Sequence, residues 1–344
     1  MLYFSHLKLA GAVCLLAIFP ALAFQRDQTP DPKSKPEQRA ALVDQSEGRR
    51  GPAQFRTEVD QVVIYTAVYD RENSLVSDLQ KEDFTVYENK VQQEITYFGQ
   101  DDIPSTVGIV IDSSGSMRGK FDLVVRATGL FLSMNNPENE LFLVSFKGEA
   151  NLEEDLTRDV QDIYDGLNNI IVSGGTALYD AIYLAVDMSR NGSEPKKTVV
   201  VFTDGEDKDS YYEHKELLEK VQESDVQIYI VAFLDSELSS GGGFFGVFKS
   251  EREKIQTKIR SIADYTGGEA FFPEEIEQLS EVFKSIASEL RKQYRLAYVS
   301  TNTVKDGSWR KIDVVVKDAK KRGLKVRAKK GYFAKKKAAQ SPPD

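Results

Sequence analysis

Short, strongly apolar segments alternate with longer segments of helical periodicity through the middle of the chain. The segments 106–112, 140–146 and 226–234 are rich in Val, Ile, Leu and Phe, as is typical of strands buried on both faces of a sheet. Between them, segments such as 123–134 and 174–190 repeat apolar residues every three or four positions. This alternation predicts an α/β domain over 102–292, with a doubly wound, mostly parallel sheet covered by helices.

Strand-like segments without intervening helices flank this region on both sides. Before it lie 58–69, 84–88 and 94–98, and after it lie 294–300, 309–318 and 324–333. Asn89-Lys90 is a turn signal that predicts a hairpin between 84–88 and 94–98. Because two or three strands alone are marginally stable in water, we predict that 55–101 and 293–334 form one small discontinuous β-sandwich. The α/β domain is then an insertion within it.

The N-terminus has the features of a cleavable secretory signal peptide. A charged start with Lys8 is followed by the apolar run 9–23, which ends in the small residues Ala21-Leu22-Ala23. The run is short for a membrane span. We therefore expect cleavage after Ala23 and a secreted or periplasmic protein, with an uncleaved membrane anchor as the alternative. The polar segments 24–54 and 335–344 are predicted to be a disordered linker and tail.

Cysteine and histidine are too scarce for several classes of site. Cys14 is the only cysteine and it lies in the predicted signal peptide, so the mature chain has no disulfide. An exported protein without disulfides fits a bacterial envelope. His214 is the only histidine after residue 23. Ser–His and Cys–His catalytic pairs and His-rich zinc sites are therefore not expected.

Oxygen-bearing side chains gather where predicted strands end. Asp112, Ser114 and Ser116 close the first strand of the α/β region, Thr176 precedes a helix in SGGTAL, and Asp204 follows VVVFT. The carboxyl ends of parallel strands share one edge of the sheet. Hydroxyl and carboxylate oxygens are ligands for hard divalent cations. The alternative is that these residues only make turns and helix caps.

The motifs D-S-S-G-S-M, G-G-T and T-D-G-E-D, in this order, resemble the von Willebrand factor type A domain. Its metal-ion-dependent adhesion site has the pattern D-x-S-x-S, then T, then D. The resemblance spans roughly 102–292 and implies a Rossmann-like fold, and the flanking β segments resemble those of bacterial secreted proteins related to this family. It implies that a divalent cation is bound by five residues: Asp112, Ser114, Ser116, Thr176 and Asp204. Mg²⁺ is the expected ion, with Mn²⁺ or Ca²⁺ as alternatives.

In the family, the serines coordinate the ion directly, the threonine does so in one conformational state, and the aspartates often act through water. One coordination position stays open for a partner's Asp or Glu carboxylate. The resemblance therefore implies a non-enzymatic protein-binding module in adhesion or envelope assembly. The alternatives are a metal-dependent hydrolase and a scaffold whose ion only holds loops together.

Residues near these motifs have two interpretations. Glu206, Asp207 and Asp209 are expected to be solvated loop charges, or else to tune the site electrostatically. Met117 is expected to pack under the loop, and Phe121 and Phe131 are expected in the core.

The segment 235–251 combines the flexible run Gly241–Gly243 with Phe244, Phe245 and Phe248. It leaves the sheet at the edge where the metal loops lie. Exposed aromatic residues normally need covering. The phenylalanines are therefore expected either to fold back onto the domain or to form part of a partner surface or lid.

Charge is distributed unevenly along the chain. The net charge is −9; residues 1–23 contribute +1 and residues 291–344 contribute +13, so residues 24–290 carry −23. The basic end is expected to carry strand-face lysines that keep sheet edges soluble. The alternative is contact with an anionic envelope surface or an acidic partner. An acidic body makes nucleic acid an unexpected partner.

Overall fold

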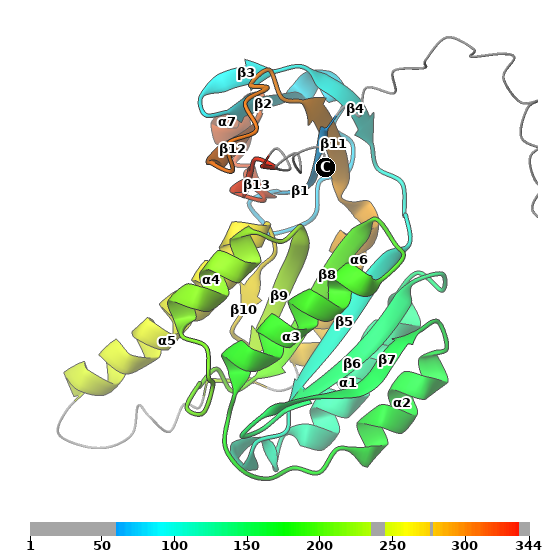
Figure 1. The fold of residues 1–344 in the computed structure, drawn as a ribbon, viewed down its shortest axis with the longest axis vertical. Coiled ribbons are helices and arrows are strands. Elements are labelled where there is room, and N and C mark those ends of the chain that lie inside the picture. Colours follow the sequence, from blue (N-terminus) through cyan, green and yellow to red (C-terminus); the bar gives the residue numbers. More distant parts are fainter. Residues whose placement is uncertain (1–59, 235–244, 276–277, 337–344) are drawn as a thin grey trace, which may run out of the picture. The chain divides into compact units, whose positions relative to one another are not determined.

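The computed structural model describes residues 60–234, 245–275 and 278–336 (Figure 1). The chain divides into two compact units, residues 1–57 and 58–344, and all described residues belong to the second. The predicted signal peptide, the linker 24–54 and most of the tail 335–344 lie outside the described residues. No described helix is both long and apolar enough to cross a membrane.

A six-stranded, mostly parallel sheet with helices on both faces forms the centre of the fold, as the sequence predicted. Its strand order is β10-β9-β8-β5-β6-β7, and only β7 runs antiparallel to its neighbour. The strands are β5 Ser105–Asp112, β6 Glu140–Phe146, β7 Ala150–Thr157, β8 Lys196–Thr203, β9 Val226–Ala232 and β10 Ala270–Phe271. The helices are α1 Phe121–Met134, α2 Val160–Asn169, α3 Leu178–Asn191, α4 His214–Gln222, α5 Phe245–Thr266 and α6 Leu279–Lys292.

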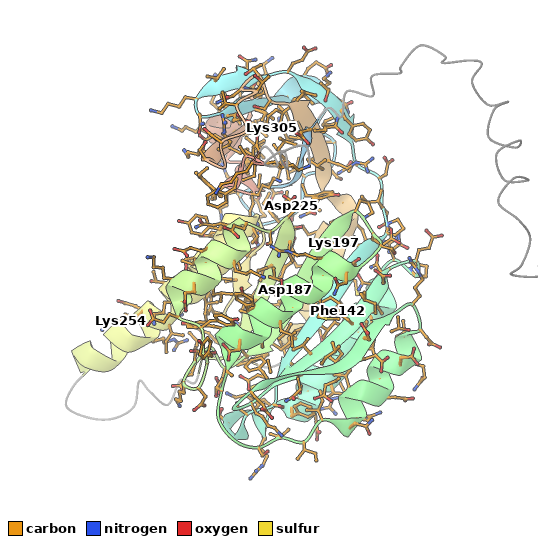
Figure 2. All side chains as sticks on the ribbon, in the orientation of Figure 1. Phe142, Asp187, Lys197, Asp225, Lys254 and Lys305 are labelled. Carbon is orange, nitrogen blue, oxygen red and sulfur yellow. The ribbon has the colours of Figure 1, made fainter. Side chains whose placement is uncertain are left out.

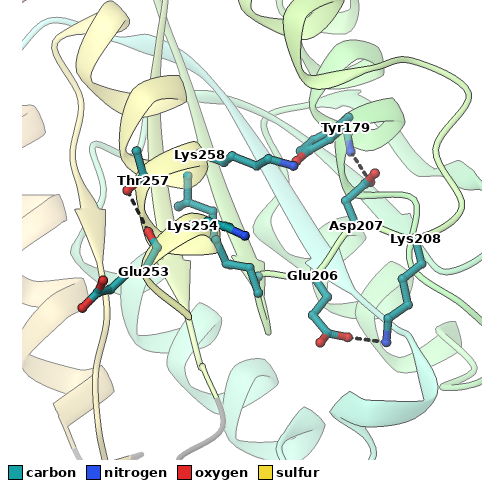
Figure 3. Close-up of a pocket in the computed structure, with 11 residues that line it drawn as sticks. Tyr179, Glu206, Asp207, Lys208, Glu253, Lys254, Thr257 and Lys258 are labelled. Atoms are coloured by element: carbon teal, nitrogen blue, oxygen red, sulfur yellow. Dashed lines mark hydrogen bonds and ion pairs between the residues drawn. The ribbon is translucent and has the colours of Figure 1, made fainter. Parts of the chain in front are cut away.

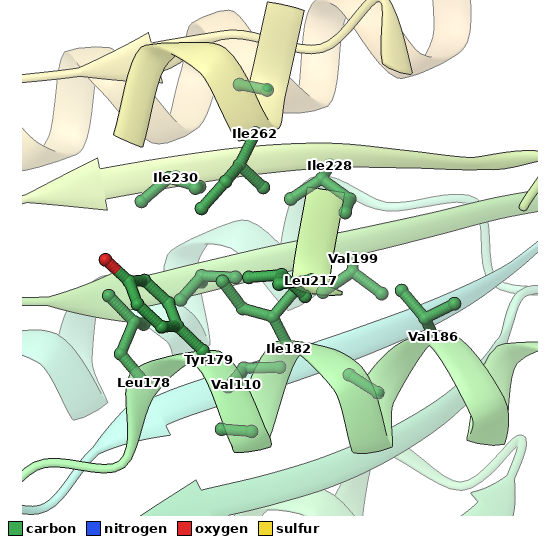
Figure 4. Packing of buried hydrophobic residues seen from close by; sticks show 14 of the residues in the cluster. Val110, Leu178, Tyr179, Ile182, Val186, Val199, Leu217, Ile228, Ile230 and Ile262 are labelled. Atoms are coloured by element: carbon green, nitrogen blue, oxygen red, sulfur yellow. The ribbon is translucent and has the colours of Figure 1, made fainter. Parts of the chain in front are cut away.

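Two apolar cores, one on each face of this sheet, hold the helices in place. Val110 of β5 belongs to the core shared with α3, α4 and α5, whereas Ile109 and Ile111 belong to the core shared with α1, α2 and α6. Because alternate residues of a strand point to opposite faces, a strand covered on both sides must be apolar throughout. Figure 4 shows Ile182 of α3 and Ile262 of α5 within the first core. Figure 2 shows the side chains of the described residues, including Phe142 of the same core.

Eight strands outside this region form two antiparallel sheets of four strands. Their orders are β13-β1-β11-β4 and β14-β12-β2-β3, so each sheet combines strands from before and after the α/β region. The strands are β1 Gln61–Tyr69, β2 Phe84–Glu88, β3 Val91–Gln93, β4 Ile95–Gly99, β11 Tyr294–Val299, β12 Trp309–Val316, β13 Lys325–Ala328 and β14 Gly331–Phe333. One apolar core, including Ile64, Val86 and Ile312, is shared by both sheets. The exact domain limits stay predictions.

The predicted hairpin has a different second strand. Asn89 and Lys90 form the turn with φ angles of 47° and 70°, as a two-residue hairpin turn requires. The strand that returns beside β2 is β3, however, and β4 pairs with β11 in the other sheet. The chain changes sheet at Glu94, which brings Ile95 into the shared core. The expectation that 94–98 pairs with 84–88 was therefore wrong.

The polar face of β13 is also not simply solvated. Arg327 forms ion pairs with Glu269 and Glu289, and the Lys329 ammonium lies 2.9 Å from the Asp225 carboxylate. These three carboxylates belong to the α/β region. Part of the basic character of the C-terminal strands therefore neutralises the acidic body of the same chain. Lys325, which precedes both in the alternation, is exposed as expected.

Candidate metal centre

The loops that follow β5 and β8 meet at the carboxyl edge of the central sheet. These strands are parallel neighbours, with Ile111 opposite Phe202, so their last residues emerge side by side. The Ser116 hydroxyl donates a hydrogen bond to the Asp204 carboxylate. The Ser114 and Ser116 hydroxyl oxygens lie 3.0 Å apart. Oxygens from two loops that are 88 residues apart in sequence therefore converge on one point.

Asp112 lies at the base of this cluster and is fully buried. Its carboxylate accepts hydrogen bonds from the Ser114 backbone N–H and the Thr203 hydroxyl, each at 2.9 Å. Burial, together with the negative charge of Asp204, raises the pKa of Asp112 to about 6. Two carboxylates lie close together here in a buried place. Burial disfavours such negative charges unless a nearby cation compensates them. The site thus has the electrostatic character that a divalent cation would satisfy.

The loop that carries Thr176 is joined to the first loop by backbone hydrogen bonds. The Gly115 N–H donates to the Gly174 carbonyl at 3.1 Å, and the Ser173 N–H donates to the Ser113 carbonyl at 2.8 Å. Thr176 is itself buried. The structure therefore brings the second predicted motif beside the first, although about 60 residues separate them.

Asp209 fixes the position of Thr176. The Asp209 carboxylate accepts the Thr176 N–H at 2.7 Å, and the Asp209 N–H donates to the Thr176 carbonyl at 3.1 Å. A Cβ atom on Gly175 would lie only 1.9 Å from Asp209 Oδ2. Glycine is therefore required if the carboxylate is to approach the backbone this closely. Asp209 is exposed, as expected for a loop charge, and it is also a positioning residue.

Asp207 and Ser210 cap the helix that follows Thr176. Helix α3 begins after Ala177, which has no side chain able to cap it. Instead, the Tyr179 N–H donates to the Asp207 carboxylate at 3.1 Å and to the Ser210 hydroxyl at 3.0 Å. Glu206 forms an ion pair with Lys208. Asp207 and Ser210 lie about 30 residues after Tyr179 in the sequence. No local signal could therefore have predicted that they cap α3.

The five predicted ligands offer oxygen atoms only, from two carboxylates and three hydroxyls. Such a set fits Mg²⁺, Mn²⁺ or Ca²⁺ and not a metal that prefers sulfur or imidazole. Within the described ranges, no group of three or more His, Cys, Asp or Glu residues could hold a metal. A site here must therefore use the hydroxyls, and metal binding stays a prediction.

The predictions for the apolar residues around the site can be compared with the structure where it describes them. Met117 and Phe131 are fully buried in the core, as expected, and Phe121 is partly buried against it. Phe244 lies outside the described residues. Phe245 and Phe248 belong to α5, but their side chains also lie outside the described part.

Comparison with known proteins supports the family assignment. Residues 107–206 match the family model of the von Willebrand factor type A domain. This segment contains all five predicted ligands. Residues 107–206 therefore match a von Willebrand factor type A domain, as their motifs predicted. No curated protein matches the chain.

Solved structures with similarity to the chain include three bacterial proteins. An aerotolerance-related membrane protein from Bacteroides fragilis is 19% identical, with 54% of this chain and 98% of that chain covered and a TM-score of 0.42. The von Willebrand factor domain of the type V pili tip protein Mfa5 from Porphyromonas gingivalis is 12% identical, with 54% and 95% covered and a TM-score of 0.44. A von Willebrand factor type A protein from Catenulispora acidiphila is 14% identical, with 83% and 76% covered and a TM-score of 0.46.

Proposed function

We propose that this von Willebrand factor type A domain binds a protein partner through a divalent cation, in adhesion or in assembly of a bacterial envelope. Asp112, Ser114, Ser116, Thr176 and Asp204 would hold the cation, with Mg²⁺ as the expected ion. When bound, the cation supplies a Lewis-acidic position for a carboxylate of the partner. The signal peptide would export the chain, so the site would face an extracytoplasmic partner.

The observation that carries this proposal is the contact between Ser116 and Asp204. The hydroxyl of one loop donates to the carboxylate of another, and the Ser114 hydroxyl lies 3.0 Å from the same Ser116 oxygen. Asp112 supports the arrangement from below by accepting the Ser114 backbone N–H. Three oxygen-bearing side chains are thus preorganised at the edge where open α/β sheets bind ligands.

The residues around the site favour binding over catalysis. His214 interacts with the Lys258 carbonyl and with the Ser261 hydroxyl, at 3.2 and 3.1 Å. Asp207 and Asp209 are engaged in holding backbone N–H groups. A hydrolase would need a base beside the reacting water, and these groups already have structural partners. We therefore include the absence of enzymatic activity in the proposal, and a phosphatase and protease screen with Mg²⁺ tests it.

Partner capture with and without metal tests the main proposal. The mature chain, immobilised, is incubated with an envelope extract of the producing organism in millimolar Mg²⁺ or in EDTA. We expect a retained protein in Mg²⁺ that is lost in EDTA and lost with Asp204→Ala. The exposed residue Asp122 provides the matched control Asp122→Ala, which should retain the partner.

Capture that survives both EDTA and Asp204→Ala would contradict the proposal. It would instead support a scaffold whose ion only holds loops together. Turnover in the activity screen that disappears with Asp204→Ala would support the hydrolase alternative.

A further inference from the structure

A pocket of about 680 Å³ lies directly beside the candidate metal site. Its walls are the loop 205–208, which follows Asp204, and the segment 253–259 of α5, with Tyr179 of α3 between them (Figure 3). This volume is within the range of pockets that hold small ligands or short peptide segments. The pocket begins one residue after a predicted metal ligand, so one bound segment can reach both places.

The floor of this pocket is apolar and closely packed. Ile259 is buried, and Ile255 packs partly buried against the same core. Gly205 has a φ angle of +88°, and a Cβ atom there would lie 2.6 Å from Leu234 and 3.0 Å from Ile259. The loop can therefore lie against α5 only with glycine at this position.

Two lysines line the pocket with ammonium groups that have no direct partner among the described residues. Lys254 and Lys258 are one helical turn apart on α5, both are exposed, and both line the pocket. Across the described ranges, neither ammonium group forms an ion pair or a side-chain hydrogen bond. Figure 3 shows Lys254 projecting into the pocket and Lys258 extending toward Tyr179.

The acidic residues of the pocket have other partners. Glu206 pairs with Lys208, and the Asp207 carboxylate accepts the Tyr179 N–H and the Ser210 hydroxyl. Glu253 also has an interaction of its own. Among the described residues, the charged groups of the pocket that have no hydrogen bond or ion pair are therefore the ammonium groups of Lys254 and Lys258.

We propose that this pocket binds a second acidic group of the partner, so that the partner presents an acidic peptide segment with two carboxylates. One carboxylate goes to the metal site and the other lies between Lys254 and Lys258. An apolar side chain of the same segment covers Ile255. This inference rests on the proposed function for the first carboxylate, and it adds the chemistry of the second.

Synthetic peptides test this inference. Each fluorescent peptide of Gly, Ser and Ala carries one Asp and a Glu placed up to about six residues away, which spans about 20 Å of extended chain. The single-acid control has Gln in place of Glu. Fluorescence anisotropy measures binding to the mature chain in millimolar Mg²⁺ and in EDTA. We expect at least one spacing to bind about threefold tighter than its control, as two solvent-exposed charge pairs allow.

A charge variant assigns this gain to the pocket. The double variant Lys254→Gln/Lys258→Gln should lose the gain while it still binds the single-acid peptide in Mg²⁺. Lys284→Gln/Lys320→Gln removes the same charge from exposed positions on α6 and the short helix α7 Ala319–Arg322, and it should keep the gain.

The possible outcomes separate the two proposals. A gain at no spacing, or a gain that survives in Lys254→Gln/Lys258→Gln, overturns the pocket inference while Mg²⁺-dependent binding of single-acid peptides upholds the metal function. If peptides with both Asp and Glu bind equally well in EDTA, and if this binding is lost in Lys254→Gln/Lys258→Gln, the metal function is overturned. The acidic-peptide pocket is then upheld.

Discussion

Arg327 of β13 forms an ion pair with Glu289 of α6, which joins an antiparallel sheet to the last helix of the α/β region. The Glu289 side chain is only 1% exposed. It also accepts hydrogen bonds from the hydroxyls of Tyr229 in β9, at 2.7 Å, and Tyr69 in β1. Segments from both ends of the described chain and from its centre thus meet at one buried carboxylate.

Breaking this pair should destabilise the fold strongly. Arg327→Met leaves the buried Glu289 charge without its cation, and such a loss costs about 3 kcal/mol or more of unfolding free energy. Lys325→Met, at an exposed position of the same strand, is the matched control. Urea unfolding followed by circular dichroism measures both variants. Equal midpoints for the two would show that the ion pair contributes little.

Removing the C-terminal strands should disrupt both antiparallel sheets. Deletion of 293–344 removes β11, the partner of β1 and β4, and β12, the partner of β2. Apolar residues of the shared core such as Ile64 and Val86 would then be exposed. We expect aggregation of a 24–292 chain in size-exclusion chromatography, whereas 102–292 alone should stay soluble. A soluble, cooperatively melting 24–292 chain would contradict this prediction.

The central sheet could be predicted because its signal is local. The strands β5, β6, β8 and β9 are apolar runs, and Ile109 and Val110 lie on opposite faces of one strand whose two faces are both covered. The metal motifs were also readable, since two of them follow the strands β5 and β8 and the third, with Thr176, precedes helix α3. The pairing of Arg327 with Glu289 was not predictable from an alternating pattern, which marks a polar face without saying whether water or a carboxylate lies opposite.

The support around the site was missed for a related reason. The bond from Thr176 to Asp209 joins residues 33 positions apart, and TDGEDKDS has the composition of any solvated acidic loop. Only the clash that a Cβ atom on Gly175 would make reveals why that glycine follows Gly174. Sequence spacing can propose ligands, whereas the groups that hold them in place depend on the packing of loops.

Divalent cations should stabilise the chain if the metal site is as proposed. A ligand that binds only the folded state adds about 2.7 kcal/mol at a hundredfold excess over its Kd. Thermal melts in millimolar Mg²⁺ or Mn²⁺ should therefore shift upward, and Asp112→Ala should remove the shift without unfolding the sheet. Asp122→Ala should keep it. Wild-type melts that do not respond to Mg²⁺, Mn²⁺ or Ca²⁺ would exclude the site.

Lys196 should make stability depend on pH. Burial lowers its pKa to about 8, and its ammonium donates to the Leu290 carbonyl at 2.6 Å. An unfolded lysine has a pKa of about 10.4, so between these values the unfolded chain binds the proton more tightly. Stability from this group therefore rises with pH above about 8, by about 2 kcal/mol up to pH 9.5.

The variant Lys196→Met isolates this contribution. It has no group to titrate, so the difference in unfolding free energy between wild type and variant should change by about 2 kcal/mol between pH 7 and pH 9.5, in favour of wild type. Urea unfolding at both pH values measures it. Lys215→Met, at an exposed position on α4, should show no such change. A constant difference for Lys196→Met would mean that the lysine keeps an ordinary pKa.

Gly175→Ala should weaken metal binding although it changes no ligand. The new Cβ atom would occupy the place of Asp209 Oδ2, 1.9 Å away, and the carboxylate must withdraw from the Thr176 N–H. Loss of a group that holds a metal ligand in place typically costs about tenfold or more in affinity. Isothermal titration calorimetry with Mg²⁺ measures the Kd. Gly119→Ala, where a Cβ atom meets nothing within 4 Å, is the matched control.

A second substitution shows whether the effect passes through Asp209. Asp209→Ala removes the same hydrogen bond from the other side, so the double variant Gly175→Ala/Asp209→Ala should bind Mg²⁺ about as weakly as either single variant. Two changes that act through one contact are not additive. Additive losses would show that Gly175 acts on the site by another route. An unchanged Kd in both single variants would show that the Thr176 backbone needs no support from Asp209.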